Sequence, residues 1–330
     1  MRFQVFPDAA STTAVQVDWL LAFLSLVTLF FLGIIFVPMG VFLYRYRRGN
    51  PVDRTPLNIS TWKIEVFWTT VPLVLTFVIF GWGAGLYVHM KTPPEDAQEI
   101  YVVGKQWMWR LQHPEGKREI NALHVPVGRT VKLMITSEDV IHSFFIPVFR
   151  VKQDAVPGRY TMEWFKATKA GTYHLFCSEY CGTQHSGMIG WVTVMEPKDY
   201  QDWLNSGSPQ ETQIAAGERL FHQLGCSGCH AENSKVRAPS LVGLYGKPVP
   251  LEGGTIVTAD ERYLHDSIVM PAKQIVFGYE NLMPSFEGQL NEEQLFQLVQ
   301  YLKHLGREQP PEYRRQGEGA AQFIVPHEAP

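Results

Sequence analysis

Residues 177 to 188 read Cys177-Ser178-Glu179-Tyr180-Cys181-Gly182-Thr183-Gln184-His185-Ser186-Gly187-Met188, which places two thiols, an imidazole and a thioether within twelve residues. Upstream, the run Val140-Ile141-His142-Ser143-Phe144 offers a second imidazole. Thiolate, imidazole and thioether ligands together favour copper over the harder cations. Two alternatives stay open at this point. One is a closed zinc site of two cysteines and two histidines, which has no use for Met188, and the other is a plain Cys177–Cys181 disulfide.

The presence of two cysteines indicates what kind of copper site this would be. A single-copper blue site uses two histidines, one cysteine and a weak axial methionine. A second thiolate lets both sulfurs bridge two coppers, so that the shared electron is delocalised and the geometry changes little on reduction. Such a site carries electrons and leaves no open position for a substrate.

The segment around this motif, from Glu99 to about Glu196, reads as a series of β-strands. It is rich in Val, Ile, Tyr, Phe and Trp, the residues that favour strands. The clearest runs are Ile100–Val103, Thr130–Ile135 and Trp191–Val194. Pro- and Gly-containing turn signals separate the runs at spacings that suit a small antiparallel sandwich or barrel.

Two windows nearer the N-terminus, Trp19–Tyr44 and Val66–Val88, contain no charged residue and no histidine. Each is longer than the roughly 20 apolar residues that cross a bilayer, so we predict membrane spans at about 19–44 and 65–88. A buried core helix rarely stays uncharged for so many turns. A cleaved signal peptide would be shorter and would be followed by small residues.

The loop between the two spans is basic. It holds Arg45, Arg47, Arg48, Arg54 and Lys63 against Asp53. By the positive-inside rule this loop is cytoplasmic, so both termini and everything after about residue 92 face outward. We therefore expect a protein of the bacterial cytoplasmic (inner) membrane, with its metal sites on the periplasmic or outer side.

The overall charge agrees with a membrane protein. The 330 residues include 29 Lys plus Arg and 32 Asp plus Glu, a net charge of −3. Charged residues make up 18 % of the chain, against about 25 % in an ordinary soluble domain, and the deficit lies in the two apolar windows. No basic stripe is available to neutralise phosphates, which argues against nucleic acid as a partner.

The segment from about Thr212 to Arg307 has helical periodicity instead of strand character. Asn291 and Gln294 resemble a capping box at the start of a helix. Apolar residues then recur on one helical face. They are Leu295, Leu298, Val299, Leu302 and Leu305. From Glu308 onward the chain is rich in Pro, Gly and charge, which predicts a loosely held tail.

Near the start of this helical segment, Cys226-Ser227-Gly228-Cys229-His230 has the pattern of covalent haem attachment. Two thiols one short turn apart can add to the two vinyl groups of a porphyrin, and the adjacent imidazole then lies under the iron. The predicted outward location is where such haem is assembled, whereas redox or zinc chemistry would suit a cytosolic chain. A Cys226–Cys229 disulfide would leave His230 unexplained.

Together these motifs resemble cytochrome c oxidase subunit II with a fused class I cytochrome c domain, over about residues 15–307. The resemblance implies a multi-domain membrane protein. It would consist of a two-helix transmembrane hairpin (1–91), an all-β cupredoxin-like copper domain (92–200), an all-α cytochrome c domain (201–308) and a flexible tail (309–330).

The resemblance also implies a ligand set for a binuclear copper centre. The ligands would be His142, Cys177, Cys181, His185, Met188 and the backbone carbonyl of Glu179. In the family the side chain of that glutamate helps hold a magnesium ion at the interface with subunit I, so Glu179 is a candidate for this role as well.

Two further positions match functional residues of the family. Trp107, in Gly104-Lys105-Gln106-Trp107-Met108-Trp109, would lie between the incoming donor and the copper, although the family often has His where this chain has Lys105. Glu65, at the start of the second span, resembles the glutamate that subunit II supplies to the mouth of a proton channel. A favourable interaction with the helix dipole, or simple solvation, explains Glu65 equally well.

In the cytochrome part, the resemblance implies that Pro239 offers its carbonyl to the imidazole of His230, which would fix the tautomer. A thioether opposite His230 would raise the reduction potential, as suits a donor to copper. Met270 ends an apparent helix, whereas Met283 lies in a loop just before the capped helix. We therefore expect Met283 to be the second axial ligand.

The implied function is the electron-input subunit of a terminal cytochrome c oxidase that reduces oxygen to water and translocates protons. Electrons would pass from an external cytochrome or respiratory complex through haem c and the copper pair to subunit I. Neither span contains a histidine, so the oxygen chemistry must belong to that partner. Other oxidase subunits and membrane lipid are expected partners too.

Two other functions remain open from the sequence. One is the copper subunit of a nitric oxide reductase, and the other is a membrane-anchored electron carrier or copper-delivery protein. A copper-delivery protein needs exchangeable ligands and has no use for haem. A quinol oxidase subunit is disfavoured because such subunits have lost the copper ligands that this chain retains.

Overall fold

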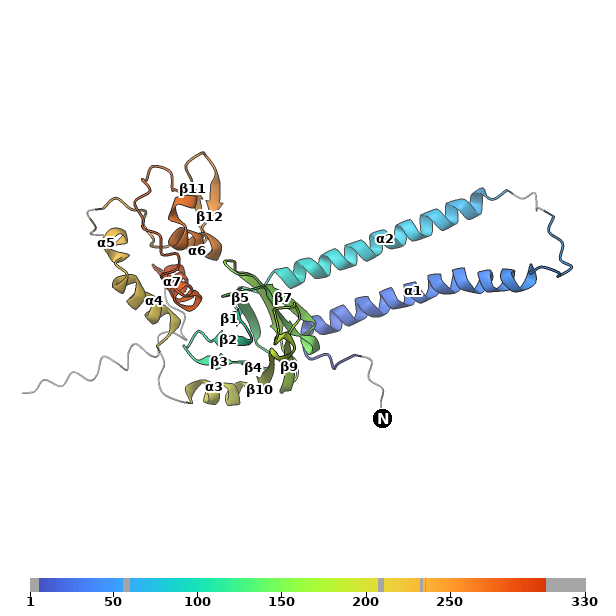
Figure 1. Ribbon diagram of the computed structural model, residues 1–330, viewed down its shortest axis with the longest axis horizontal. Coiled ribbons are helices and arrows are strands. Elements are labelled where there is room, and N and C mark those ends of the chain that lie inside the picture. The colour runs from blue at the N-terminus through green and yellow to red at the C-terminus, as the bar shows by residue number, and fades with distance from the viewer. Residues whose placement is uncertain (1–5, 56–59, 207–210, 232–233, 235, 307–330) are drawn as a thin grey trace, which may run out of the picture.

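The computed structural model describes residues 6–55, 60–206, 211–231, 234 and 236–306, and the predicted tail at 309–330 lies outside these residues. Two long helices, a β-sandwich and a small helical unit follow one another along the chain (Figure 1). The predicted fold class is confirmed: a transmembrane hairpin, a cupredoxin-like domain and a helical cytochrome c domain.

The hairpin consists of α1 (Thr12–Arg45) and α2 (Trp62–Lys91), which extend away from the rest of the molecule (Figure 1). Both helices are long and apolar enough to cross a membrane, and none of their most apolar stretch is buried in the protein. A helix that is apolar all round needs lipid or partner helices to cover it. Both helices are longer than the predicted spans.

The N-terminal part of α1 and the C-terminal end of α2 are both hydrogen-bonded to the sandwich. Asp18 of α1 accepts two hydrogen bonds from the guanidinium of Arg150, at 2.9 and 3.1 Å. At the end of α2, the carbonyl of His89 accepts a hydrogen bond from the indole N–H of Trp164 at 3.2 Å. The N-terminal segment and the sandwich therefore lie at the same end of the hairpin.

The sandwich has two five-stranded sheets, in the orders β3-β2-β1-β5-β8 and β4-β10-β9-β6-β7. The strands are β1 (Gln98–Lys105), β2 (Met108–Gln112), β3 (Arg118–Ile120), β4 (Ala122–Pro126), β5 (Thr130–Ser137), β6 (His142–Ile146), β7 (Val151–Ala155), β8 (Thr161–Lys166), β9 (Gly171–Cys177) and β10 (Ile189–Met195). The three clearest predicted runs lie within β1, β5 and β10.

The prediction of a purely antiparallel sandwich is wrong for two strand pairs. β1 pairs with β5 in parallel, and β10 pairs with β4 in parallel. A parallel pair needs a crossover rather than a tight hairpin. Here the chain visits the opposite sheet between the two partners of each pair, which brings it back in the same direction.

A single apolar core lies between the two sheets, because alternate side chains of each strand point inward. Trp109, Phe144, Phe149 and Phe165 are completely buried in it. Cys177, Cys181 and Met188 belong to the same buried cluster. The motif that the sequence singles out is therefore built onto the edge of a close-packed core.

The helical unit contains α4 (Gln213–Gln223), α5 (Ser227–His230), α6 (Glu261–Val269), α7 (Glu292–His304) and the short strands β11 (Pro248–Pro250) and β12 (Ile256–Thr258). The predicted capping box of Asn291 and Gln294 is present at the start of α7. Where α4 crosses α7, a Cβ on Gly217 would lie 2.0 Å from the backbone oxygen of Gln297, so only glycine permits this approach. Two one-turn 3-10 helices, η1 (Pro147–Phe149) and η3 (Pro271–Lys273), and α3 (Pro197–Asn205) complete the connections.

The helical unit rests on the sandwich through α7. The rings of Phe296 and Tyr101 of β1 stack with their centroids 3.3 Å apart. Beside them, the ammonium group of Lys303 lies 2.9 Å from Glu99 and 3.0 Å from Glu261, and Lys132 lies 2.7 Å from Glu99. Burial disfavours the charged form of Glu99, but the two lysines outweigh burial and lower its pKa to about 2.

Candidate metal and haem sites

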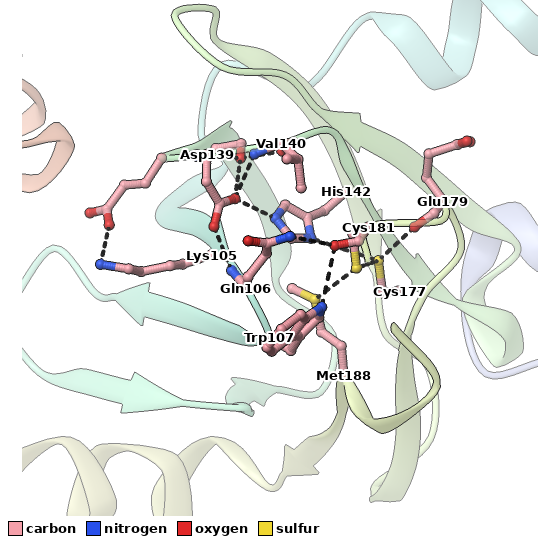
Figure 2. Close-up of polar contacts among 12 residues, drawn as sticks. Lys105, Gln106, Trp107, Asp139, Val140, His142, Cys177, Glu179, Cys181 and Met188 are labelled. Atoms are coloured by element: carbon pink, nitrogen blue, oxygen red, sulfur yellow. Dashed lines mark hydrogen bonds and ion pairs between the residues drawn. The ribbon is translucent and has the colours of Figure 1, made fainter. Parts of the chain in front are cut away.

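The predicted copper ligands converge at one end of the sandwich. His142 begins β6, Cys177 ends β9, and the loop that follows carries Cys181, the 3-10 helix η2 (His185–Gly187) and Met188. The Sγ atoms of the two cysteines lie 3.7 Å apart, and Cys181 Sγ lies 3.4 Å from His185 Nδ1 and 3.9 Å from Met188 Sδ. His142 Nδ1 approaches Cys177 Sγ to 4.0 Å from the other side. The structure therefore brings all five side chains together. Figure 2 shows His142, Cys177, Cys181 and Met188.

This donor set fits a copper pair. The two thiols are not bonded to each other, since a disulfide would require about 2.05 Å between the sulfurs. The ligand atoms of His142, Cys177 and Cys181 all lie within 4.8 Å of one another and are buried. Soft sulfur atoms flanked by an imidazole on each side are the ligands that copper prefers. Met188, which is 1 % exposed, adds the thioether that a zinc site would not use.

The surroundings of Cys177 and Cys181 shift the pKa values of their thiols in opposite directions. Burial would raise the pKa of the Cys177 thiol, but hydrogen bonds from His142 and from backbone groups outweigh burial and lower that pKa to about 6. Burial and the neighbouring Cys177 raise the pKa of Cys181 to about 12. One thiolate is thus favoured in the folded protein before the second one forms.

The loop 178–188 carries most of the proposed copper ligands, and we call it the copper loop. Trp107 and Gln106 contact it directly. The indole N–H of Trp107 donates to the carbonyl of Cys181 at 3.2 Å, and the Gln106 side-chain amide donates to the same carbonyl at 2.8 Å. Gly182 makes this approach possible, since its φ is +115° and a Cβ there would lie 2.9 Å from the Gln106 amide nitrogen.

Asp139 is a residue that the sequence analysis missed. Its Oδ1 lies 2.8 Å from Nε2 of His142, and its Oδ2 accepts the backbone N–H of Gln106 at 2.7 Å (Figure 2). Burial works against ionisation of Asp139, but these hydrogen bonds outweigh burial and lower its pKa. Its position three residues before a histidine in a strand-like run was the only signal, and that spacing is common in loops.

The side chains of the two glutamates predicted as site residues lie apart from the sulfur cluster. The backbone carbonyl of Glu179 lies 3.3 Å from Cys177 Sγ, while its exposed side chain points away from the sulfurs (Figure 2). Glu65 lies in the first turn of α2, at the far end of the hairpin, where its carboxylate accepts a 2.6 Å hydrogen bond from the Thr61 hydroxyl.

The second cysteine motif lines a cavity in the helical unit. The cavity is lined by Cys226, Cys229, His230 and Pro239, and by Met283 from the loop before α7. Most of the remaining lining residues lie in the segments between α5 and α6 and between α6 and α7, and a few apolar side chains of α6 and α7 complete the wall. Nδ1 of His230 lies 3.0 Å from the carbonyl oxygen of Pro239.

The residues around this cavity fit a covalently attached haem. Cys226 and Cys229 are not bonded to each other, so both sulfurs are available for thioether bonds. An apolar cavity with an imidazole and a thioether in its lining suits a porphyrin with two axial ligands. Met270 lies at the C-terminal cap of α6, is 36 % exposed and is not part of the cavity wall.

Three family models match consecutive parts of the chain. Residues 1–81 match the transmembrane domain of cytochrome c oxidase subunit II, and residues 117–195 match its periplasmic domain. Residues 214–306 match cytochrome c.

Proteins named cytochrome c oxidase subunit 2 are similar to this chain over most of their length. Cytochrome c oxidase subunit 2 of Thermostichus vulcanus is 31 % identical over 282 residues, which cover 67 % of this chain and 85 % of that protein. The same subunit of Alkalihalophilus pseudofirmus is 26 % identical over 287 residues, 82 % of either chain. Among solved structures, the periplasmic domain of subunit II of cytochrome oxidase of Bradyrhizobium japonicum is 33 % identical and covers 35 % of this chain and 96 % of that one, with a TM-score of 0.34.

Proposed function

Because this chain belongs to the cytochrome c oxidase subunit II family and ends in a cytochrome c domain, we propose that it is the electron-input subunit of its oxidase. The observation that supports this role best is the closed cluster of two cysteines, two histidines and a methionine at the edge of the sandwich core. Such a cluster has all its donor atoms turned toward one another, which suits transfer of electrons rather than binding of a substrate.

The copper pair would be held by the five side chains and by the backbone carbonyl of Glu179. The two metal ions would be held by the thiolates of Cys177 and Cys181, the imidazoles of His142 and His185 and the thioether of Met188. The bound pair would supply one-electron chemistry with little change of geometry. The protein's part is to exclude water from the cluster, since Cys177, Cys181 and Met188 are each at most 8 % exposed.

The haem would be held through thioether bonds to Cys226 and Cys229, and the side chains of His230 and Met283 would bind its iron. The hydrogen bond between His230 Nδ1 and the Pro239 carbonyl leaves Nε2 as the nitrogen that faces the metal. The bound haem would accept single electrons from an external donor, a cytochrome or a respiratory complex.

Trp107 is the residue proposed for electron input to the copper domain. Its indole contacts the copper loop through the hydrogen bond to the Cys181 carbonyl, which connects it directly to a residue proposed as a copper ligand. We keep Glu179 as the proposed contributor to a magnesium site facing subunit I, on the ground that its side chain is exposed beside the cluster. Glu65 is kept as the proposed contributor to a proton channel at the other end of α2.

The proposed placement in the membrane follows from the hairpin. The basic loop between α1 and α2 faces the cytoplasm by the positive-inside rule, so the sandwich and the cytochrome domain face the periplasm. The contact between Asp18 and Arg150 supports this placement, because it holds the N-terminal segment and the sandwich at the same end. Oxidase subunit I and membrane lipid would cover the exposed apolar sides of both helices.

The test is the metal content and spectrum of the detergent-solubilised full-length protein. We expect two coppers and one covalent haem per chain, with the near-infrared absorption of a delocalised copper pair. Cys181→Ser should abolish the copper absorption and leave the haem spectrum intact, because the two sites share no residue. One copper per chain, or zinc in its place after loading with both metals, would contradict the proposal.

A further inference from the structure

The carboxylate of Asp139, in the turn between β5 and β6, joins two parts of the copper region. Its Oδ1 lies 2.8 Å from Nε2 of His142 and accepts the backbone N–H of Val140 at 2.7 Å. Its Oδ2 accepts the backbone N–H of Gln106 at 2.7 Å. Nδ1 of His142 is turned toward Cys177, so Nε2 carries the hydrogen that Asp139 accepts.

The segment that Asp139 holds on its other side also contacts the copper loop. Gln106 and Trp107 both donate to the carbonyl of Cys181, at 2.8 and 3.2 Å. The segment is thus linked to the ligand set at two points, directly at Cys181 and through Asp139 at His142 (Figure 2).

We propose that Asp139 is a positioning residue with two effects. It makes His142 a stronger nitrogen donor to copper, and it fixes the Gln106–Trp107 segment in position relative to His142. This inference rests on the proposed function, because it takes His142 as a copper ligand and Trp107 as the point of electron input. A carboxylate that accepts from a ligating imidazole fixes the orientation of the ring and makes it a stronger donor to the metal. A stronger nitrogen donor favours the oxidised metal, so Asp139 lowers the reduction potential of the site.

The neighbouring acid supplies a matched control. Glu138 precedes Asp139 in the same turn and carries the same charge, but its carboxylate pairs with Lys105 at 3.1 Å and with Arg110. Among the described residues, neither of these two partners is a proposed copper ligand. A general effect of negative charge near the copper would therefore appear in both acids, whereas an effect of the specific hydrogen bonds would appear only at Asp139.

The experiment compares Asp139→Ala, Asp139→Asn and Glu138→Gln in the full-length protein loaded with copper. Two quantities are measured: the reduction potential of the copper site, and the hydrogen-exchange rate of the backbone amide of Gln106, which donates to Asp139. In Asp139→Ala we expect the affinity ratio of oxidised to reduced copper to fall about tenfold, which raises the potential by about 59 mV for a one-electron couple. We expect at least about tenfold faster amide exchange, since the Gln106 N–H loses its acceptor.

Asp139→Asn separates the two effects, because its single side-chain oxygen can serve His142 or Gln106 but not both. The Asp139→Asn variant should therefore restore either the wild-type reduction potential or the wild-type exchange rate. It also keeps the inference testable if Asp139→Ala does not fold. Glu138→Gln should leave both quantities at the wild-type values. The inference is overturned if Asp139→Ala and Asp139→Asn behave as wild type, or if Glu138→Gln produces the same shifts. If the wild-type chain binds no copper pair, the proposed function fails instead, and the exchange measurement still tests the link between Asp139 and Gln106.

Discussion

Glu163 of β8 is a buried carboxyl group that no proposed site uses. It is 5 % exposed, and neither of its side-chain oxygens has a hydrogen-bond partner among the described residues. Burial raises its pKa to about 8, although the positive charges of Lys91 and Lys152 act in the opposite direction. The folded protein therefore keeps this group protonated at pH values at which the unfolded chain, with a pKa of about 4.5, has already lost the proton.

The substitution Glu163→Gln should stabilise the protein, and the gain should depend on pH. The stability of wild type is fully retained below pH 4.5 and falls as the pH rises toward 8, whereas glutamine has no proton to lose. Thermal unfolding followed between pH 5 and 9 should show a gain of a few kcal/mol that grows up to about pH 8 and then levels off. The exposed Glu287→Gln is the control, and a gain independent of pH would contradict the assignment.

Met283 is proposed as the second axial ligand of the haem because it lines the cavity and Met270 does not. Met283→Ala should remove the weak sulfur-to-iron absorption band and lower the haem potential, since a thioether raises it. Met270→Ala, at an exposed helix end, should leave the band unchanged. Loss of the band in the Met270 variant alone would reverse the assignment.

The clustering of the proposed copper ligands could be predicted from the sequence because four of the five side chains fall within twelve residues. The contacts of Gln106 with Asp139 and Cys181 could not be predicted, because these hydrogen bonds join residues 33 and 75 positions apart. The prediction of Met283 as an iron ligand rests on its place in a loop before a capped helix and on the resemblance to class I cytochromes c.

At the scale of elements, the contact between α7 and the sandwich depends on one buried ammonium group. Lys303 is 7 % exposed and lies within 3.0 Å of two carboxylates, Glu99 and Glu261. Lys303→Ala would remove a positive charge from beside both carboxylates. Because breaking a buried ion pair leaves uncompensated charge, we expect the free energy of unfolding to fall by about 3 kcal/mol. Denaturant unfolding of the cytochrome domain in the full chain should show this loss.

The exposed Lys247→Ala serves as the control for this prediction and should change the free energy of unfolding by less than about 0.5 kcal/mol. An equal loss in both variants would mean that the cluster contributes nothing specific. Acid should weaken the same contact, because the depressed pKa of Glu99 gives a stability that is present above pH 4.5 and is lost as the pH falls toward 2.

The elements themselves were largely predictable, and their pairing was not. The strand runs, the membrane helices and the capping box of α7 each have a local signature of composition or period. The parallel pairs β1–β5 and β4–β10 depend on how the chain crosses between sheets. The docking of α7 on β1 could not be predicted from the sequence either, because Phe296 and Lys303 lie outside the apolar face of α7 that packs the cytochrome core.

At the scale of the whole molecule, the proposed orientation in the membrane can be tested by chemical labelling. Arg48→Cys places a thiol in the loop between α1 and α2, and Glu252→Cys places one on the exposed surface of the cytochrome domain. A membrane-impermeant maleimide applied to cells with a permeabilised outer membrane should label the second variant only. Labelling of the Arg48→Cys variant before the inner membrane is broken would reverse the orientation, and the unsubstituted chain reports the background.

The seating of α7 on β1 has a consequence for the kinetics of electron delivery. Because both domains belong to one chain, the proposed electron transfer between them would be first-order, with a rate independent of protein dilution. The stacked rings and the Lys303 cluster would hold the two domains at a fixed separation. Only the arrival of the proposed outside donor would be second-order and sensitive to ionic strength. Under the proposed function, the protein would then carry one molecule of its own reductant at a fixed local concentration.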